Sequence, residues 1–250
     1  MTEPTHLEAA IAAAELAGEA LRQNYNTELA VDELKRHDIK LNLDVRCQRL
    51  ISDHLLKCFP EHEIIGEEGN DGKTGAEYQW IVDPIDGTVN YYFGIPHFCV
   101  SIALRRRGQI ILGVIYDPMM RELFTVEKGG QPTLNGRSIH VSQRATLAES
   151  VITVGFSKTT ESIDAGGKRF LRLAHSVRKT RILGSAALAM AYIACGRLDA
   201  YIEESISIWD VAAGILLVEA AGGRVELRSS PDNPDRFSIV ATNGRLTGLE

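Results

Sequence analysis

Cysteine is scarce in this 250-residue chain, and its spacing excludes the common cysteine-based sites. No CxxC pair is present, and no zinc-ligand spacing is visible. Two of the four cysteines stand inside the apolar runs "HFCVSIAL" and "AYIACG". Reduced, buried thiols are typical of a cytosolic protein, so we expect a cytoplasmic location. The four cysteines are Cys47, Cys58, Cys99 and Cys195.

The sequence also lacks an apolar run of the ~20 residues that a membrane-spanning helix needs. Its first segment, "MTEPTHLEAAIAAAELAGEAL", has no basic stretch and carries four glutamates. We therefore expect an amphipathic helix from near Thr5 to about Tyr25 rather than a signal peptide, and no membrane partner. Thr5 and Glu8 have the spacing of a capping box at the start of this helix.

Positive charge is outnumbered in the chain. The 27 Lys and Arg residues face 33 Asp and Glu residues, which gives a net charge of -6. This balance argues against nonspecific binding to nucleic acid or to an acidic membrane. A protein of this charge that acts on an anionic substrate needs local positive charge, such as bound cations. The hydrophobic content of 44% fits a soluble globular protein with a sizeable core.

The pattern of expected elements changes near residue 142. Before it, a second helix is expected over 45–59, and "FCVSIALRRRGQIILGVIYDP" predicts two strands joined at 107–109. After it, strands alternate with helices such as "SAALAMAYIACG" and "WDVAAGILLVEAAGG". We therefore expect an α+β subdomain over 1–142 and an α/β subdomain over 143–250.

Several acidic residues stand where apolar elements end. Glu67 follows the strand "EIIG", Asp83 and Asp86 follow "WIV", Asp210 opens an apolar helix, and Asp44 precedes another. α/β proteins place their sites at such ends. Carboxylates gathered in one place repel one another unless cations compensate, and hard divalent cations take oxygen ligands. Taken singly, these acids also fit turns or helix N-caps.

The stretch "DPIDGT", which begins at Asp83, has features that a plain turn does not require. Pro84 stiffens the loop, so the carboxylates of Asp83 and Asp86 keep a fixed separation. Gly87 lets a backbone approach closely, and Thr88 offers a hydroxyl. A helix that begins there would point its free N–H groups at an anion. Metal-binding carboxylates beside such a helix start predict a phosphate site.

Three motifs in the sequence resemble the signatures of one protein family. "GEE" at 66–68, "DPIDGTVN" at 83–90 and "WDVAAG" at 209–214 are similar to the three signatures of the inositol monophosphatase family of Mg-dependent, often lithium-sensitive phosphatases. The resemblance extends through 116–142 and 184–204, so it covers most of the chain. It implies the layered α-β-α-β-α sandwich of the inositol monophosphatase and sugar phosphatase type. It also implies hydrolysis of a small phosphate monoester by metal-activated water.

The resemblance implies roles for individual residues, a homodimer, and two to three Mg²⁺ ions per site, with Mn²⁺ as an alternative ion. Asp44 and Thr88 would orient the attacking water, and Glu67 would also face a third metal. The metal ligands would be Glu67, Asp83, Asp86, Asp210 and the backbone carbonyl of Ile85. The substrate-binding residues would be Asp86, Gly87, Thr88, Gly184, Ser185, Ala186, Glu203 and Asp210.

The chain departs from the family pattern in three places. Leu41 stands where the family has a threonine before the Asp44 position. A basic loop residue of many members is matched only loosely, by Lys35 or Lys40. Ser207 stands where the animal inositol enzymes have a histidine. The expected metal ligands are intact, so we expect activity, whereas the inositol substrate and lithium sensitivity stay open.

The leading interpretation is a phosphoric monoester hydrolase that acts on inositol 1-phosphate or another polyol or sugar phosphate. Histidinol phosphate, fructose 1,6-bisphosphate and 3'-phosphoadenosine phosphate are the alternative substrates within the same fold. The haloacid-dehalogenase phosphatases carry a DxDGT motif, but their two acids are two apart, whereas Asp83 and Asp86 are three apart around a proline. The last alternative, a non-catalytic phosphosugar-binding module, is disfavoured because every expected ligand is present.

Overall fold

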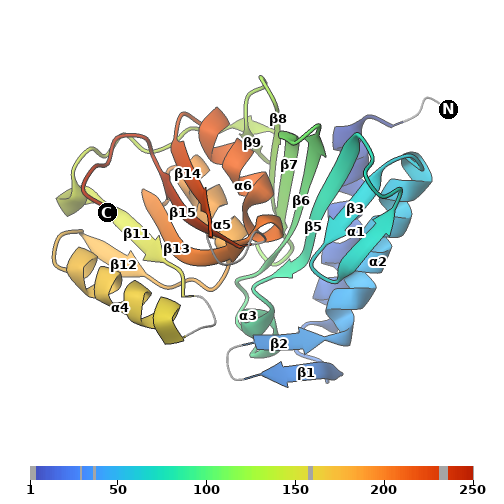
Figure 1. The fold of residues 1–250 in the computed structure, drawn as a ribbon, viewed down its shortest axis with the longest axis horizontal. Coiled ribbons are helices and arrows are strands. Elements are labelled where there is room, and N and C mark those ends of the chain that lie inside the picture. Colours follow the sequence, from blue (N-terminus) through green and yellow to red (C-terminus); the bar gives the residue numbers. More distant parts are fainter. Residues whose placement is uncertain (1–3, 29, 36–37, 157–159, 231–235, 250) are drawn as a thin grey trace.

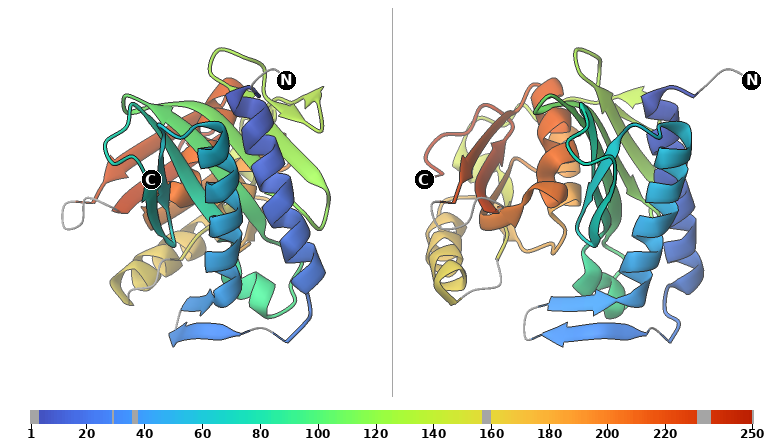
Figure 2. Two further views of the ribbon diagram at one scale, coloured as in Figure 1. Left: turned by 90° about the vertical axis from the view of Figure 1, so that its right-hand side faces the viewer. Right: turned by 45° about the vertical axis from the view of Figure 1, so that its right-hand side comes forward.

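The computed structural model describes residues 4–28, 30–35, 38–156, 160–230 and 236–249. Five layers stack in the order helix, sheet, helix, sheet, helix (Figures 1 and 2). Helices α1 (His6–Asn24) and α2 (Asn42–Cys58) cover the outer face of the larger sheet. Helices α5 (Ala186–Ala194) and α6 (Ile208–Ala220) lie between the two sheets, and α4 (Thr160–Ala174) covers the far face of the smaller one. This order confirms the predicted α-β-α-β-α sandwich.

The larger sheet has eight strands in the order β10-β9-β8-β7-β6-β5-β3-β4. Strands β3 and β5 pair in parallel, and the other neighbours are antiparallel. The predicted turn between β6 and β7 is confirmed at Arg107 and Gly108, both of which have positive φ. The strands are β3 (Glu63–Gly66), β4 (Gly69–Gly72), β5 (Tyr78–Asp86), β6 (Cys99–Arg106), β7 (Gln109–Asp117), β8 (Glu122–Glu127), β9 (Thr133–Leu134) and β10 (Arg137–Ser138).

The smaller sheet has five strands in the order β12-β11-β13-β15-β14. Strand β11 pairs in parallel with β12 and β13, whereas β15 pairs antiparallel with β13 and β14. A separate antiparallel hairpin, β1 with β2, precedes α2. The remaining strands are β1 (Val31–Lys35), β2 (Asp38–Leu41), β11 (Val151–Val154), β12 (Lys179–Arg181), β13 (Ala200–Ser207), β14 (Arg224–Ser229) and β15 (Arg236–Thr242), and a short 3-10 helix, Leu147–Glu149, precedes β11.

Small residues let the central helices lie close to the larger sheet. Helix α6 packs on β7, where a Cβ added to Gly113 would lie 2.8 Å from the carbonyl oxygen of Ala213. Helix α5 is buried on almost every side, and Tyr192 is its one half-buried residue. The central core therefore holds the starts of α5 and α6 rigidly against both sheets. Within the described ranges, no helix is long and apolar enough to cross a membrane.

Element ends differ from the sequence expectation at three acids. Helix α2 begins at Asn42 and α6 at Ile208, so Asp44 and Asp210 lie inside the first helical turns. The stretch 83–86, which was expected to form a loop, belongs to β5 as far as Asp86, because the strand still pairs with β6 beyond an irregularity between the two acids. The boundary between the two sheets falls between β10 and β11, and the division into subdomains 1–142 and 143–250 stays a prediction.

Candidate functional site

Three carboxylates from two separate elements meet at one point. Asp83 and Asp86 end β5, and Asp210 stands in the first turn of α6. One carboxylate oxygen from each lies within 4.8 Å of the other two. Asp83 and Asp86 are buried, and Asp210 is half-buried. The fold thus brings together acids that are 127 positions apart at the extremes, 210 minus 83.

Burial and mutual repulsion raise the pKa values of these acids. Burial is the largest cause for Asp83, whose pKa is also raised by the charges of Glu67, Asp86 and Asp210. Asp210 behaves in the same way, with burial first and then the charges of Glu67 and Asp86. Such a cluster does not ionise fully without compensating positive charge. Clustered, buried oxygen donors therefore fit a divalent cation such as Mg²⁺.

Asp86 is held by the start of α5. Its carboxylate accepts hydrogen bonds from the Ser185 hydroxyl at 2.5 Å and from the backbone N–H groups of Ala187 at 2.7 Å and Ala186 at 3.2 Å. The Cys99 thiol lies 3.7 Å away. Burial raises the pKa of Asp86, and these hydrogen bonds oppose that rise. Two residues predicted to bind substrate therefore contact a predicted metal ligand directly.

Asp44 and Thr88 are in contact, as the resemblance implies. The Thr88 hydroxyl lies 3.3 Å from a carboxylate oxygen of Asp44 and donates to the Ile85 carbonyl oxygen at 2.9 Å. The other Asp44 oxygen accepts the Leu41 N–H at 2.7 Å. Burial, followed by neighbouring glutamate charges, raises the pKa of Asp44 to about 7. A carboxyl group with this pKa can hold or release a proton near neutral pH.

The expectation that Asp44 and Asp210 cap helices is confirmed in part. Asp44 accepts the N–H of Leu41, and Asp210 accepts the N–H of Ser207 at 2.9 Å. Each acid stands three residues after the residue that caps its helix, rather than at the cap itself. Each carboxylate can therefore stabilise the first turn of its helix with one oxygen.

Sequence reasoning missed Gln48, which supports the "GEE" segment. Its side chain accepts a hydrogen bond from the Glu68 N–H and donates one to the Gly69 carbonyl oxygen, each at 2.8 Å. The available signal was its place one helical turn after Asp44, on the same face of α2. Lys40 forms an ion pair with Glu68. The side chain of Lys35, the other candidate for the basic loop residue, lies outside the described residues.

Gly87 and Asn90 join α3 (Thr88–Tyr92) to the turn before α5. Gly87 has φ of 99°, and a Cβ there would lie 3.2 Å from the Gly184 carbonyl oxygen. The Asn90 side chain donates to the carbonyl oxygens of His97 and Leu183 at 2.8 and 2.9 Å. The predicted helix start at Thr88 and the need for glycine before it are confirmed, whereas the anchoring role of Asn90 was missed.

A cavity of about 300 Å³ is lined by Glu67, Asp83, Asp86 and Asp210, whereas Asp44 is not among its lining residues. Besides the acids, Tyr201 lines it, and its hydroxyl donates a hydrogen bond to Glu203 at 2.5 Å. A larger cavity, of about 480 Å³, borders the outer side of β14 and β15, and its described lining contains none of the predicted metal ligands. The smaller cavity is lined by every predicted substrate-binding residue: Asp86, Gly87, Thr88, Gly184, Ser185, Ala186, Glu203 and Asp210.

Known proteins share both the sequence and this architecture. The sequence model of the inositol monophosphatase family matches residues 3–248. The chain is 41% identical to a Nus factor SuhB from Xylella fastidiosa over 251 residues, covering 93% of this chain and 88% of that protein. It is 40% identical to inositol monophosphatase 2 from Solanum lycopersicum over 249 residues, covering 96% and 94%.

Solved structures agree with these matches. The extragenic suppressor protein suhB from Bartonella henselae superposes with a TM-score of 0.88 at 34% identity, covering 95% of this chain and 93% of that one. An inositol monophosphatase from Anabaena (Nostoc) sp. PCC 7120 superposes with a TM-score of 0.82 at 36% identity, covering 96% and 90%. The likeness therefore extends over nearly the whole chain.

Proposed function

The chain belongs to the inositol monophosphatase family and is a phosphoric monoester hydrolase, and from this premise we propose that it hydrolyses a small polyol or sugar phosphate with Mg²⁺. The observation that supports this proposal is the meeting of Asp83, Asp86 and Asp210 on a cavity that Gly87 and Thr88 also line. In the reaction, the oxygen of water bonds to phosphorus, and the ester bond to the leaving oxygen breaks. The products are inorganic phosphate and an alcohol.

Two to three Mg²⁺ ions would be held at the acidic end of this cavity, with Mn²⁺ as an alternative ion. When bound, the cations would supply the charge that neutralises the phosphate and lowers the pKa of water. Three of their carboxylate partners, Asp83, Asp86 and Asp210, are already placed together, so little rearrangement is needed to bind them. The proposed ligands are Glu67, Asp83, Asp86, Asp210 and the Ile85 carbonyl.

The remaining residues orient the substrate and the water. Asp44 and Thr88 form the pair that would hold the attacking water, and Asp44 would accept its proton. The N–H groups of Gly87 and Thr88 would donate to the phosphate oxygens. Helix α3 has only five residues, so these individual N–H groups, rather than a long helix dipole, would provide the contact.

The substrate class follows from the other end of the cavity. Glu203 lines it and would accept hydrogen bonds from leaving-group hydroxyls, which favours a polyol or sugar phosphate. Histidinol phosphate, fructose 1,6-bisphosphate and 3'-phosphoadenosine phosphate remain the alternatives. Some relatives bear the name inositol monophosphatase and others Nus factor SuhB. That this chain has no nucleic-acid partner stays a prediction, supported by its net charge of -6.

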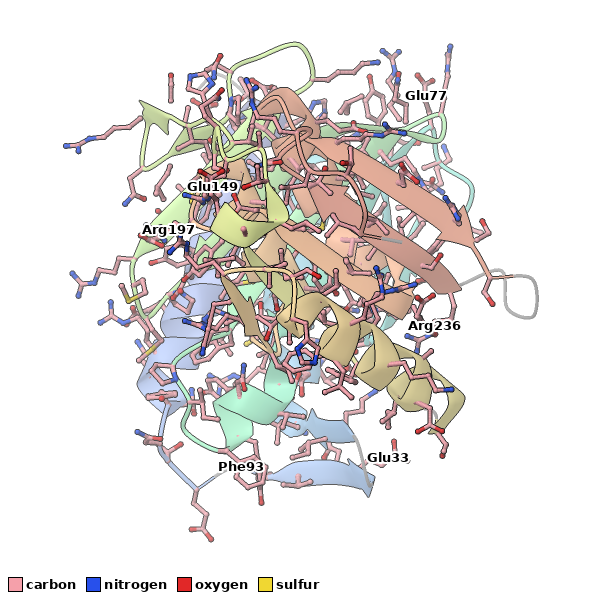
Figure 3. The ribbon with its side chains drawn as sticks, turned by 90° about the vertical axis from the view of Figure 1, so that its left-hand side faces the viewer. Glu33, Glu77, Phe93, Glu149, Arg197 and Arg236 are labelled. Atoms are coloured by element: carbon pink, nitrogen blue, oxygen red, sulfur yellow. The ribbon has the colours of Figure 1, made fainter. Side chains whose placement is uncertain are left out.

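We also propose that the protein is a homodimer. Four apolar side chains are exposed within seven residues of α3 and the turn after it, and Figure 3 shows Phe93 in this region. Their exposed fractions are 43% for Val89, 37% for Tyr92, 67% for Phe93 and 48% for Ile95. Apolar side chains gathered on a surface are typical of a face that a partner covers, and a two-fold dimer is the commonest closed assembly.

Phosphate release from a panel of phosphomonoesters tests the proposed activity. With Mg²⁺ the protein should release phosphate from inositol 1-phosphate or another polyol or sugar phosphate, and EDTA should stop the release. Asp86→Asn should lower turnover at least ~100-fold, the scale for loss of one strong transition-state contact. The amide keeps the shape of the side chain but loses its charge, so high Mg²⁺ should restore part of the activity.

The same assay contains the outcomes that would contradict the proposal. Near-normal turnover of Asp86→Asn at low Mg²⁺ would mean that Asp86 is not a metal ligand. A trapped phospho-enzyme would indicate a protein nucleophile instead of water. Absence of release from the whole panel, by folded wild-type protein with Mg²⁺, would support the non-catalytic binding module.

A further inference from the structure

Tyr201 and Glu203 are neighbours on one face of β13. They stand two residues apart in the strand, so their side chains point to the same side of the sheet. The Tyr201 ring is buried, with 2% of its surface exposed, and its hydroxyl donates to a carboxylate oxygen of Glu203 at 2.5 Å. Both residues line the cavity that holds the acids. A rigid, buried ring therefore fixes one oxygen of a flexible side chain.

Gly155 makes room for the same carboxylate from the neighbouring strand. It directly follows β11, which pairs in parallel with β13, and its N–H donates to the Ile202 carbonyl oxygen at 2.9 Å. A Cβ at Gly155 would lie 1.7 Å from Glu203 Oε2 and 2.5 Å from its Cδ. Gly155 is not among the glycines with positive φ, so its backbone does not require glycine. A side chain at this position would instead push the Glu203 carboxylate away from its observed place.

We infer that Tyr201 and Gly155 are positioning residues that hold Glu203 where it selects leaving groups rich in hydroxyls; this inference rests on the proposed phosphatase function. A free glutamate side chain would lose rotamer freedom on binding substrate. Here the hydrogen bond from Tyr201 and the close approach of the Gly155 backbone fix the Glu203 side chain before substrate binds. Because a carboxylate only accepts hydrogen bonds, it favours an alcohol with hydroxyls beside the ester over one with plain CH₂ groups.

Two matched substrates separate selection from chemistry. Inositol 1-phosphate and cyclohexyl phosphate have the same ring, but only the first carries hydroxyls. For wild-type protein, kcat/KM should be higher for inositol 1-phosphate. Tyr201→Phe and Gly155→Ala should each lower the ratio of the two kcat/KM values about 10-fold, the effect of a charge-assisted hydrogen bond. The loss should appear in KM for inositol 1-phosphate, because the contact exists before and during reaction.

Two control variants and two variants of Glu203 make the test specific. Gly167→Ala adds a Cβ that meets nothing within 4 Å, and Tyr25→Phe removes a hydroxyl that is bonded to the Gly94 carbonyl oxygen; both should keep the wild-type ratio. Glu203→Ala should lower the ratio. Adding Tyr201→Phe to Glu203→Ala should lower it no further, because Tyr201 acts through Glu203. Melting temperatures show that each variant is folded.

The outcomes distinguish this inference from the function on which it rests. If wild-type protein hydrolyses both substrates equally well, Glu203 does not select leaving groups by their hydroxyls, and the inference is wrong. The inference is also wrong if Tyr201→Phe and Gly155→Ala keep the wild-type ratio, or if Tyr201→Phe lowers it further in the Glu203→Ala background. In all these cases phosphatase activity is intact. Failure of wild-type protein to hydrolyse either substrate or any other phosphomonoester would overturn the proposed function, and the inference with it.

Discussion

Asp83 shows how a single residue links stability to cation binding. Its pKa is raised first by burial and then by the charges of Glu67, Asp86 and Asp210. A raised pKa means that the folded state binds more protons than the unfolded state between the two pKa values. The group therefore stabilises the fold at acid pH, and this contribution is lost as pH rises from the ordinary Asp value of 3.8 toward the raised one.

The substitution Asp83→Asn should consequently stabilise the metal-free protein at pH 8 and abolish activity. In EDTA we expect its melting temperature to exceed that of wild type by about 3 °C, corresponding to about 1 kcal/mol. The difference should be smaller at pH 5 than at pH 8, because a raised pKa makes Asp83 take up its proton more readily as the pH falls. Differential scanning fluorimetry at both pH values measures this. An equal fall of melting temperature at both pH values would instead show that the fit of the side chain at this position, rather than its charge, determines the stability.

At this same scale, the sequence allowed the acids to be predicted but not their supports. Asp83 and Asp86 stand in one short motif, so their meeting is a local matter. Gln48 supports a distant segment, and Tyr201 contacts Glu203 because both lie on the same face of one strand. Glutamine and tyrosine occur in any fold, so neither residue stands out in the sequence. Their roles depend on the pairing of distant elements, which periodicity and spacing do not specify.

Between elements, Asp199 connects segments that are far apart in the chain. It is fully buried, and its carboxylate accepts hydrogen bonds from the Val151 N–H at 2.7 Å, from Arg144 Nε at 2.8 Å and from the Ser142 hydroxyl. The Asn243 side chain lies 3.4 Å away. These contacts join the start of β13 to β11, to the segment before β11, and to the segment after β15.

We predict that Asp199→Ala destabilises the protein by about 3 kcal/mol, because it leaves buried donors without a partner. The melting temperature should fall by roughly 6–12 °C. The exposed Asp53, on α2, offers the control: Asp53→Ala should change stability by less than about 0.5 kcal/mol. Urea unfolding of both variants measures the difference. Equal stabilities for the two would show that the Asp199 contacts contribute little net free energy.

Helices and strands with strong local sequence signals were predictable, but the residues at which they begin and end were harder to predict. The first helix was predicted from its capping box and apolar face, and both the helix and the box are confirmed. The stretch 83–86 was expected to form a loop, whereas β5 extends to Asp86. Pairing with β6 resumes opposite Cys99, and only the partner strand reveals that the extended segment reaches Asp86. Local sequence cannot show where a neighbouring strand still offers hydrogen-bond partners.

For the whole molecule, the layer order came from the family resemblance rather than from the pattern of elements. Alternating strands and helices predict an α/β unit, yet β13 is parallel to β11 and antiparallel to β15. The eight-stranded order likewise places β3 between β5 and β4, away from simple chain order. Such arrangements depend on how complete layers bury one another, so three motifs in the right order were the stronger guide.

The exposed apolar side chains on and after α3 lead to a prediction for the assembly. At micromolar concentration the wild-type protein should sediment as a dimer, at twice 27.5 kDa. Phe93→Asp should shift it to the monomer, because a carboxylate at the centre of an apolar contact loses its hydration. Leu171→Asp, at a similarly exposed position on α4, should leave the dimer intact. Wild-type sedimentation at 27.5 kDa would refute the dimer, whereas a dimer that persists in Phe93→Asp would move its interface to another face.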